Sequence, residues 1–153
     1  MNIVMLHDAV SSDSSADERD VFVQMEAIAA ALADLGHESS QLPCTLDLNA
    51  AARSLRQVGP DLVFNLVESL GGQGRLIHLA PSLLDSLGMA FTGCPTDAIY
   101  ATSNKLLAKR LLAGAGIATP VWFSSNELAR GASVPPGRYI IKSVWEHASR
   151  GLD

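Results

Sequence analysis

Residues 61–67 read Asp61-Leu-Val-Phe-Asn-Leu-Val67, and this stretch decides the fold class. Its side chains are nearly all apolar, and valine and phenylalanine favour strands. A run of this kind is typical of a strand buried on both faces of a parallel sheet. The stretch therefore predicts an α/β protein built on a parallel sheet.

Strand and helix signals alternate ahead of this stretch. Residues 2–7 are an apolar run of strand length, and residues 37–42 supply a second strand. A helix between them ends at Gly36, because apolar side chains recur there in steps of four and three residues, at Val21, Met25, Ile28, Leu32 and Leu35. Another helix covers residues 48–55 and ends at Gly59-Pro60.

Strand and helix signals continue to alternate after residues 61–67. Helical signals cover residues 76–87, where Pro81 allows either a helix with the proline in its first turn or one kinked element. Residues 90–92 form a short strand closed by Gly93. We therefore predict an open, mostly parallel, Rossmann-like sheet flanked by helices, with right-handed crossovers.

The pattern changes near residue 102, which divides the chain into residues 1–101 and 102–153. Ser103 is the predicted cap of a helix that runs to Ala115. Residues 138–143 are strand-like but have no visible partner. Either this strand joins the first sheet or the chain is the front part of a longer protein, and we favour the second interpretation.

Composition narrows the function classes. The 153 residues are 48% hydrophobic and 18% charged, with a net charge of −5. A generic nucleic-acid binder needs a basic face, which this balance does not supply. No apolar run approaches the roughly 18–20 residues that cross a bilayer. Cys44 and Cys94 have neither metal-ligand spacing nor the density of a disulfide scaffold. We expect a soluble, reduced, cytoplasmic protein.

No Walker-type loop and no Gly-x-Gly-x-x-Gly fingerprint occurs in the sequence. The glycine cluster Gly71-Gly72-Gln73-Gly74 follows the buried strand and precedes a helix. Its backbone amides could face an anion. The simpler interpretation, which we favour, is a turn that needs positive φ.

An ordered series of segments resembles one family. The segments are Asp61 to Asn65, Gly71 to Gly74, Leu83 to Gly93, Asn104-Lys105-Leu-Leu-Ala-Lys109, Gly116-Ile-Ala-Thr-Pro120, Tyr139-Ile-Ile-Lys142 and Glu146-His-Ala-Ser149-Arg-Gly151. The first three resemble the amino-terminal domain of D-alanine–D-alanine ligases. The others resemble the family's Asp-Lys-x-x-x-Lys helix, its Gly-Ile-Pro-Thr-Pro exit, and the first strand and glycine-rich hairpin of an ATP-grasp fold. The resemblance makes residues 1–101 a pre-ATP-grasp domain and residues 102–153 the start of a truncated ATP-grasp domain.

The resemblance implies an ATP-dependent carboxylate–amine ligase. In that family ATP phosphorylates a carboxylate, an amine attacks the acyl phosphate, and Mg²⁺ and cationic groups offset the charge. The Mg²⁺ ligands would lie beyond Asp153, so we assign no metal ligand here and expect this chain to be inactive alone. The implied partner is a small amino acid or peptide, with neither nucleic acid nor membrane, and a homodimer is the assembly to test.

The resemblance also assigns the cofactor-binding residues. Lys105 matches the family's helix lysine and Lys142 its strand lysine, both of which contact ATP phosphates. Glu146, Ser149 and Gly151 fall in the hairpin that closes over those phosphates. The alternatives are two solvated lysines and an ordinary polar turn.

Two acids match the substrate side of the family. Glu18 matches the glutamate that meets the ammonium of the first substrate, although Ser15-Ala-Asp-Glu18 also has the spacing of a capping box. Glu68 stands where the family usually carries a histidine, beyond the carboxyl end of the buried strand, and its alternative is a solvated loop residue. His7 and Asp8 end the first strand at the same rim, and we interpret them as incidental.

The sequence also departs from the family in the hairpin. Ala148 occupies a position where the family has a serine on the substrate side. Together with Glu68 this predicts that D-alanine is a poor substrate. Two alternatives stay open: a non-catalytic α/β ligand-binding or interaction module, and a two-lysine nucleotide binder that serves a partner subunit.

Overall fold

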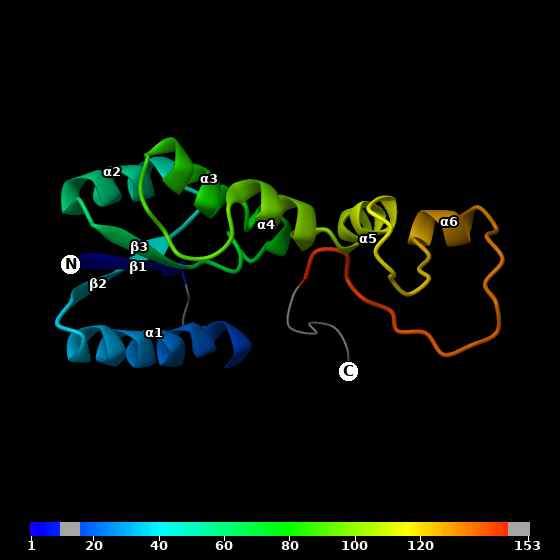
Figure 1. Cartoon of the computed structure of the whole chain (residues 1–153), viewed down its shortest axis with the longest axis horizontal. Coiled ribbons are helices and arrows are strands. Elements are labelled where there is room, and N and C mark those ends of the chain that lie inside the picture. The colour runs from blue at the N-terminus through cyan, green and yellow to red at the C-terminus, as the bar shows by residue number, and fades with distance from the viewer. Residues whose placement is uncertain (10–15, 147–153) are drawn as a thin grey trace. The chain divides into compact units, whose positions relative to one another are not determined.

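The computed structural model of the chain describes residues 1–9 and 16–146 (Figure 1). The chain divides into two compact units, Met1–Tyr100 and a second unit that begins at Ala101. The first unit is built on a three-stranded parallel sheet in the order β2-β1-β3. Its strands are β1 (Asn2–Asp8), β2 (Glu38–Cys44) and β3 (Leu62–Leu66). The predicted open parallel α/β sheet is therefore confirmed.

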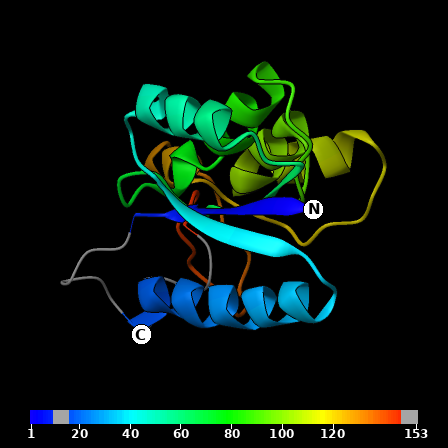
Figure 2. The same cartoon turned by 90° about the vertical axis from the view of Figure 1, so that its left-hand side faces the viewer.

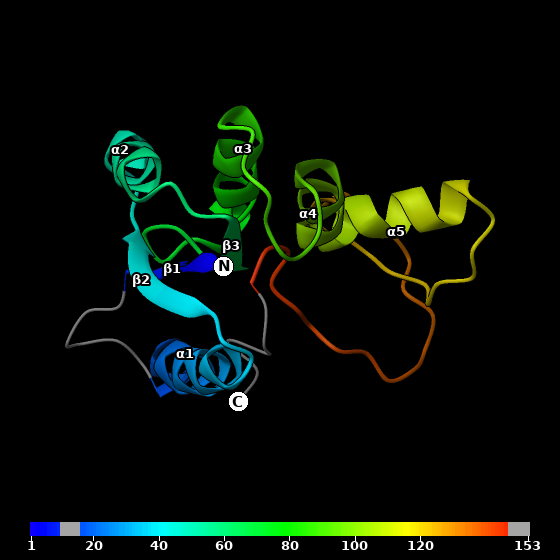
Figure 3. The same cartoon turned by 60° about the vertical axis from the view of Figure 1, so that its left-hand side comes forward.

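Helices cover both faces of this sheet. The helix α1 (Ala16–Asp34) connects β1 to β2 and lies on one face. On the opposite face lie α2 (Leu48–Val58) and α3 (Leu79–Ser86), as Figure 3 shows. Figure 2 shows the sheet edge-on between α1 and α2. Successive crossovers on opposite faces make the sheet grow outward in both directions from β1.

Residues 90–92 lie beside β3 as a single parallel bridge between Val63 and Phe91. The Val63 N–H donates to the Ala90 carbonyl at 2.9 Å, and the Thr92 N–H donates to the Val63 carbonyl at 3.0 Å. The predicted short strand is thus present as a single bridge at the edge of the sheet.

Pro81 lies in the first turn of α3, which starts at Leu79 after a 3₁₀ turn, η1 (Gly74–Leu76). Of the two alternatives that the sequence left open, the helix with Pro81 in its first turn is the observed one. The missing N–H of a proline costs nothing at that position, because the first amides of a helix have no partner within the helix.

The main core lies between the sheet and the helices α2 and α3. It gathers the buried side chains Val4, Leu6, Cys44, Ala51, Leu55, Val63, Val67, Leu70, Ala80 and Leu84. Side chains alternate along β1, so Ile3 and Met5 face α1, where Met25 is also buried. The predicted apolar face of α1 is only partly covered, since Leu35 at its end is 71% exposed.

The second unit contains α5 (Lys105–Gly114) and α6 (Ser125–Ala129), and α4 (Thr96–Ser103) runs across the division. The prediction that Ser103 caps the long helix is wrong, because Ser103 ends α4. Asn104 is the cap instead: its backbone is extended, with φ −89° and ψ 105°, and its Oδ1 accepts from the N–H groups of Leu106 and Leu107 at 3.0 Å each.

The predicted strand over residues 138–143 is also wrong. Within the part of the chain that the structure describes, this segment pairs with no other strand. Ile140 and Ile141 are 73% and 87% exposed. Strand propensity alone cannot satisfy backbone hydrogen bonds, which need a neighbouring strand.

No helix among the described residues is long and apolar enough to span a bilayer.

Candidate functional site

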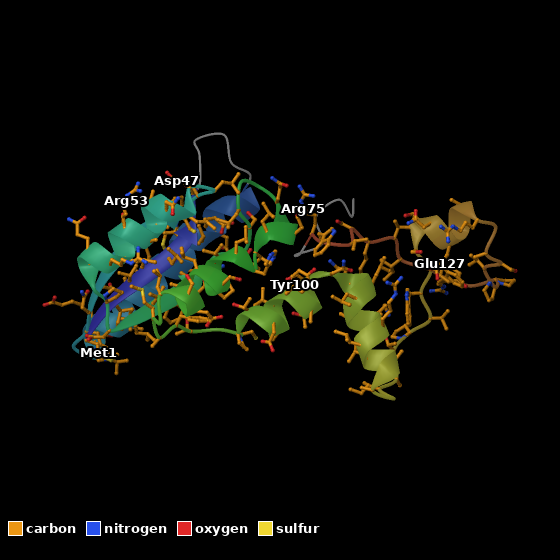
Figure 4. The ribbon with its side chains drawn as sticks, turned by 90° about the horizontal axis from the view of Figure 1, so that it is seen from above. Met1, Asp47, Arg53, Arg75, Tyr100 and Glu127 are labelled. Atoms are coloured by element: carbon orange, nitrogen blue, oxygen red, sulfur yellow. The ribbon has the colours of Figure 1, made fainter. Side chains whose placement is uncertain are left out.

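The sheet topology predicts one ligand-binding position in the first unit. In an open parallel sheet, ligands bind beyond the carboxyl ends of the strands where the order reverses. Here the chain leaves β1 toward β2 by way of α1 and returns across β1 to β3 by way of α2. The predicted position, which we call the crevice, therefore lies beyond the carboxyl ends of β1 and β3. In Figure 4, Asp47 and Arg75 lie toward this end of the first unit and Met1 lies at the opposite end.

The carboxylate of Asp8 ties the loop that follows β3 to the end of β1. It accepts hydrogen bonds from the Glu68 N–H at 2.9 Å, from the Ser69 N–H at 2.9 Å and from the Ser69 hydroxyl at 2.7 Å. Sequence reasoning missed this contact and interpreted Asp8 as incidental. The one available signal was an acidic residue at the end of a central strand.

Glu68 lies exposed just beyond β3, at the predicted rim of the sheet. Glu18 lies in the first turn of α1, the helix that follows β1. The side chain of Glu18 and the proposed capping residue Ser15 fall outside the described part of the chain. Both predicted acids thus belong to segments that follow the two strands bordering the crevice.

His7 and Cys44 are buried at the ends of their strands and do not present reactive groups. The Nδ1 atom of His7 lies 2.7 Å from the carbonyl oxygen of Asp8, and its ring packs 6.2 Å from the ring of Phe22 in α1. Burial raises the pKa of the Cys44 thiol to about 11, and the nearby Asp8 carboxylate adds to the rise. The thiol therefore stays protonated and unreactive at neutral pH.

The glycine cluster forms a tight turn, as we favoured. The Gln73 N–H donates to the Leu70 carbonyl at 3.2 Å, and the Leu70 N–H donates to the Gln73 carbonyl at 3.4 Å. Gly71 and Gly72 between them have φ of 58° and 70°. Two successive positive φ values strongly favour glycine.

The second unit brings Lys105, Lys142 and Glu146 together. Lys105 is the first residue of α5; its backbone N–H donates to the Val144 carbonyl at 3.0 Å, and its Nζ donates to the carbonyl oxygen of Glu146. Burial lowers the pKa of Lys105, the positive charge of Lys142 lowers it further, and the Glu146 carboxylate opposes both. Two neighbouring cations that repel each other have the charge that would suit a polyanion. Ser149 and Gly151 lie outside the described residues.

Lys109, the other lysine of the α5 motif, is engaged within its own unit. Its Nζ donates to the Thr119 hydroxyl at 2.9 Å and to the Pro120 carbonyl at 3.0 Å, and lies 5.3 Å from the centre of the Trp122 ring. The motif therefore contains one lysine beside a second cation and one lysine that fixes the segment after α5.

No metal centre forms among the described residues: across 1–9 and 16–146, no three His, Cys, Asp or Glu side chains gather so that they could hold an ion.

Comparison with known proteins gives one consistent result. The chain is 33% identical over 138 residues to a D-alanine–D-alanine ligase of Moorella thermoacetica, covering 89% of this chain and 41% of that protein. It is 34% identical over 148 residues to the D-alanine–D-alanine ligase of Anaplasma centrale, covering 94% of this chain and 69% of that protein. For the ligase of Caulobacter sp. strain K31 the identity is 33% over 149 residues, covering 95% of this chain and 44% of the relative. No protein-family model matches the chain.

Proposed function

Since the chain belongs to the D-alanine–D-alanine ligase family, we propose that it supplies the amino-terminal part of an ATP-dependent carboxylate–amine ligase. The chain spans less than half the length of the Moorella and Caulobacter relatives. We therefore assign the reaction to the full-length native protein, and expect residues 1–153 alone to bind nucleotide weakly and to release no phosphate from ATP.

The pair Lys105 and Lys142 carries the nucleotide part of this proposal. The charge of Lys142 lowers the pKa of Lys105, which shows that the two ammonium groups interact electrostatically. A polyphosphate placed at this pair would replace repulsion by attraction. When bound, ATP supplies the phosphoryl group that activates a carboxylate. Our proposed role for the lysines is to hold that group in place and to offset its charge.

The hairpin residues have a related proposed role. The Glu146 carbonyl accepts a hydrogen bond from the Lys105 ammonium, which fixes the end of the lysine side chain. With Ser149 and Gly151, this segment would cover the phosphates and exclude water. The described residues offer no three-ligand metal cluster, so the proposal gives none of them a role as a Mg²⁺ ligand.

Glu18 and Glu68 form the proposed substrate side. A carboxylate beside the crevice suits an ammonium group, and both residues follow strands that border it. Glu68 and Ala148 differ from the family pattern, so we expect D-alanine to be used poorly and another small amino acid or a short peptide to be used better.

The binding test compares three single variants in the full-length native protein. Lys105→Ala and Lys142→Ala should each weaken ATP binding about tenfold to a hundredfold, since each removes a charged contact of roughly 1.5–3 kcal/mol. Arg110→Ala, which removes an exposed cation from the same helix α5, is the matched control. Isothermal titration calorimetry that gives wild-type affinity in both lysine variants removes the assignment.

The activity test is phosphate release from ATP with Mg²⁺ and a panel of amino acids and dipeptides. Amine-dependent release by the full-length protein supports a ligase. ATP binding without release under every condition would instead favour the non-catalytic module. Fastest turnover with D-alanine would overturn the proposed substrate preference while leaving the ligase intact.

A further inference from the structure

We propose that Asp8 is a positioning residue for the substrate crevice: its carboxylate holds the loop after β3 so that Glu68 meets the substrate in a fixed place. The proposal rests on the function proposed above, because it treats the crevice beyond β1 and β3 as the amino-acid site.

The geometry shows a carboxylate whose two oxygens both serve the loop. Oδ1 accepts from the Glu68 N–H at 2.9 Å, and Oδ2 accepts from the Ser69 N–H at 2.9 Å and from the Ser69 hydroxyl at 2.7 Å. Asp8 thereby contacts two residues that follow it in the chain by 60 and 61 positions. Because the N–H groups of Glu68 and Ser69 both point toward Asp8, the two peptide planes that flank Glu68 are set, and with them the direction in which its side chain leaves the backbone.

The loop after β3 is ordered by hydrogen bonds from its backbone to side chains. The pairing of β3 with β1 ends at Leu66. Beyond that point the Val67 N–H donates to the Asn65 side chain at 3.3 Å, and the next two amides donate to Asp8. Hydrogen bonds to an ionised acceptor are roughly twice as strong as neutral ones. The Asp8 carboxylate is therefore the anchor of the loop that follows β3.

Asp61 provides a matched carboxylate at the opposite end of the same two strands. Its Oδ2 accepts from the Asn2 N–H at 2.7 Å across 59 positions. There, however, the main chain also pairs, since the Asp61 N–H donates to the Asn2 carbonyl at 2.9 Å. Asp61 thus secures the starts of two strands far from the crevice, and its loss should affect stability without affecting substrate binding.

The first arm of the test is hydrogen exchange of the Glu68 and Ser69 amides, measured by NMR on residues 1–153 and independent of activity. Asp8→Ala should speed exchange of both amides about tenfold or more, since it removes their acceptor. Ser69→Ala, which removes one donor and keeps the carboxylate, should give a smaller change in the same direction. Unchanged exchange in Asp8→Ala, or an equal change in Asp61→Asn, overturns the anchor.

The second arm is steady-state kinetics of amino-acid-dependent phosphate release by the full-length native protein. Asp8→Asn keeps the shape of the side chain but replaces one acceptor oxygen by a donor NH₂ group. It should raise the KM for the amino acid about tenfold to a hundredfold, as expected when a charged contact to the substrate is weakened, and leave the KM for ATP unchanged. Asp61→Asn should leave both values unchanged.

The outcomes separate the two proposals. An active wild-type protein whose Asp8→Asn variant keeps the wild-type KM for the amino acid overturns the positioning role and leaves the ligase function intact. A wild-type protein without amino-acid-dependent phosphate release overturns the ligase function and, with it, the role of Asp8 toward a substrate.

Discussion

Each of the two units is stabilised internally in its own way. All the buried hydrophobic side chains of the described residues lie between Ile3 and Leu84, in the first unit. In the second unit, α5 and α6 have no buried residue. Local contacts order them instead: Asn104 caps α5, and Ser124 with Glu127 forms a capping box on α6.

This difference separates a region stabilised by burial from one stabilised mainly by hydrogen bonds, among them the local caps of its helices. Burying a leucine side chain contributes about 1.5–3 kcal/mol, whereas a helix cap contributes about 1 kcal/mol. We therefore expect the first unit to unfold as one cooperative core and the second to open at lower free energy.

Truncating a leucine should give the largest contrast. Leu55 in α2 is 0% exposed and belongs to the core, whereas Leu111 in α5 is 52% exposed. Leu55→Ala should lower the free energy of unfolding by about 2–5 kcal/mol, and Leu111→Ala by less than about 0.5 kcal/mol. Urea unfolding followed by circular dichroism measures both. Equal losses would contradict the assignment of the core to one unit.

Replacing the glycine that ends a helix should give the next largest effect. Gly59 after α2 has φ 58°, Gly116 after α5 has φ 72°, and an added Cβ would meet no atom within 4 Å at either position. Alanine in this conformation costs roughly 1–2 kcal/mol from backbone strain alone. Gly59→Ala should therefore speed amide exchange throughout the core of the first unit. Gly116→Ala should speed it only around α5, and a core-wide response to Gly116→Ala would contradict separate unfolding.

Removing a helix cap should show the same contrast between the two units, with a smaller loss of stability. The Asp47 side chain accepts from the Ala50 N–H at 3.0 Å at the start of α2, as the Asn104 side chain does for α5. Asp47→Ala should lower the thermal midpoint of the first unit by the equivalent of about 1 kcal/mol. Asn104→Ala should reduce the helicity of α5 and leave that midpoint unchanged. Calorimetry with residue-resolved NMR distinguishes the two, and equal shifts of the midpoint would refute the contrast.

The same difference explains how much the sequence could predict. In the first unit, apolar periodicity records burial against the sheet, so the elements of residues 2–92 could be predicted, with α2 ending at Gly59. In the second unit the sequence predicts the helix cap one residue too early, at Ser103 in place of Asn104, because serine and asparagine are both good caps. The choice depends on where α4 ends, and no apolar pattern had indicated α4. The segment 138–143 has strand propensity without a strand partner.

The candidate site could be predicted only where local motifs mark it. Lys105 and Lys142 stood out by resemblance, and the electrostatic interaction between them follows only from the three-dimensional structure. The contact from Asp8 to Ser69 joins positions 61 residues apart, and no periodicity or spacing rule encodes such a pair. Their functional roles stay predictions.

The smallest expected effect concerns the titration of Lys105, and it tests the second unit directly. Burial is the main cause of its lowered pKa and the charge of Lys142 is the next, while Glu146 acts in the opposite sense. Lys142→Ala should therefore raise the pKa of Lys105 only part of the way to the ordinary 10.5, and Glu146→Gln should lower it. NMR titration of the lysine side-chain signals measures both shifts.

The sign of the accompanying stability change follows from linkage. Because the pKa of Lys105 is lower in the folded unit than in the unfolded chain, the unfolded chain binds more protons between the lowered value and the ordinary 10.5. The free energy of unfolding of the second unit should consequently rise with pH across that window, and Lys142→Ala should narrow the window. A polyphosphate such as ATP should raise the pKa of Lys105 in the wild-type protein by stabilising the ammonium, and should raise it less in Lys142→Ala if both lysines share the anion. An equal rise in the two proteins would show that Lys142 contributes nothing to the anion site.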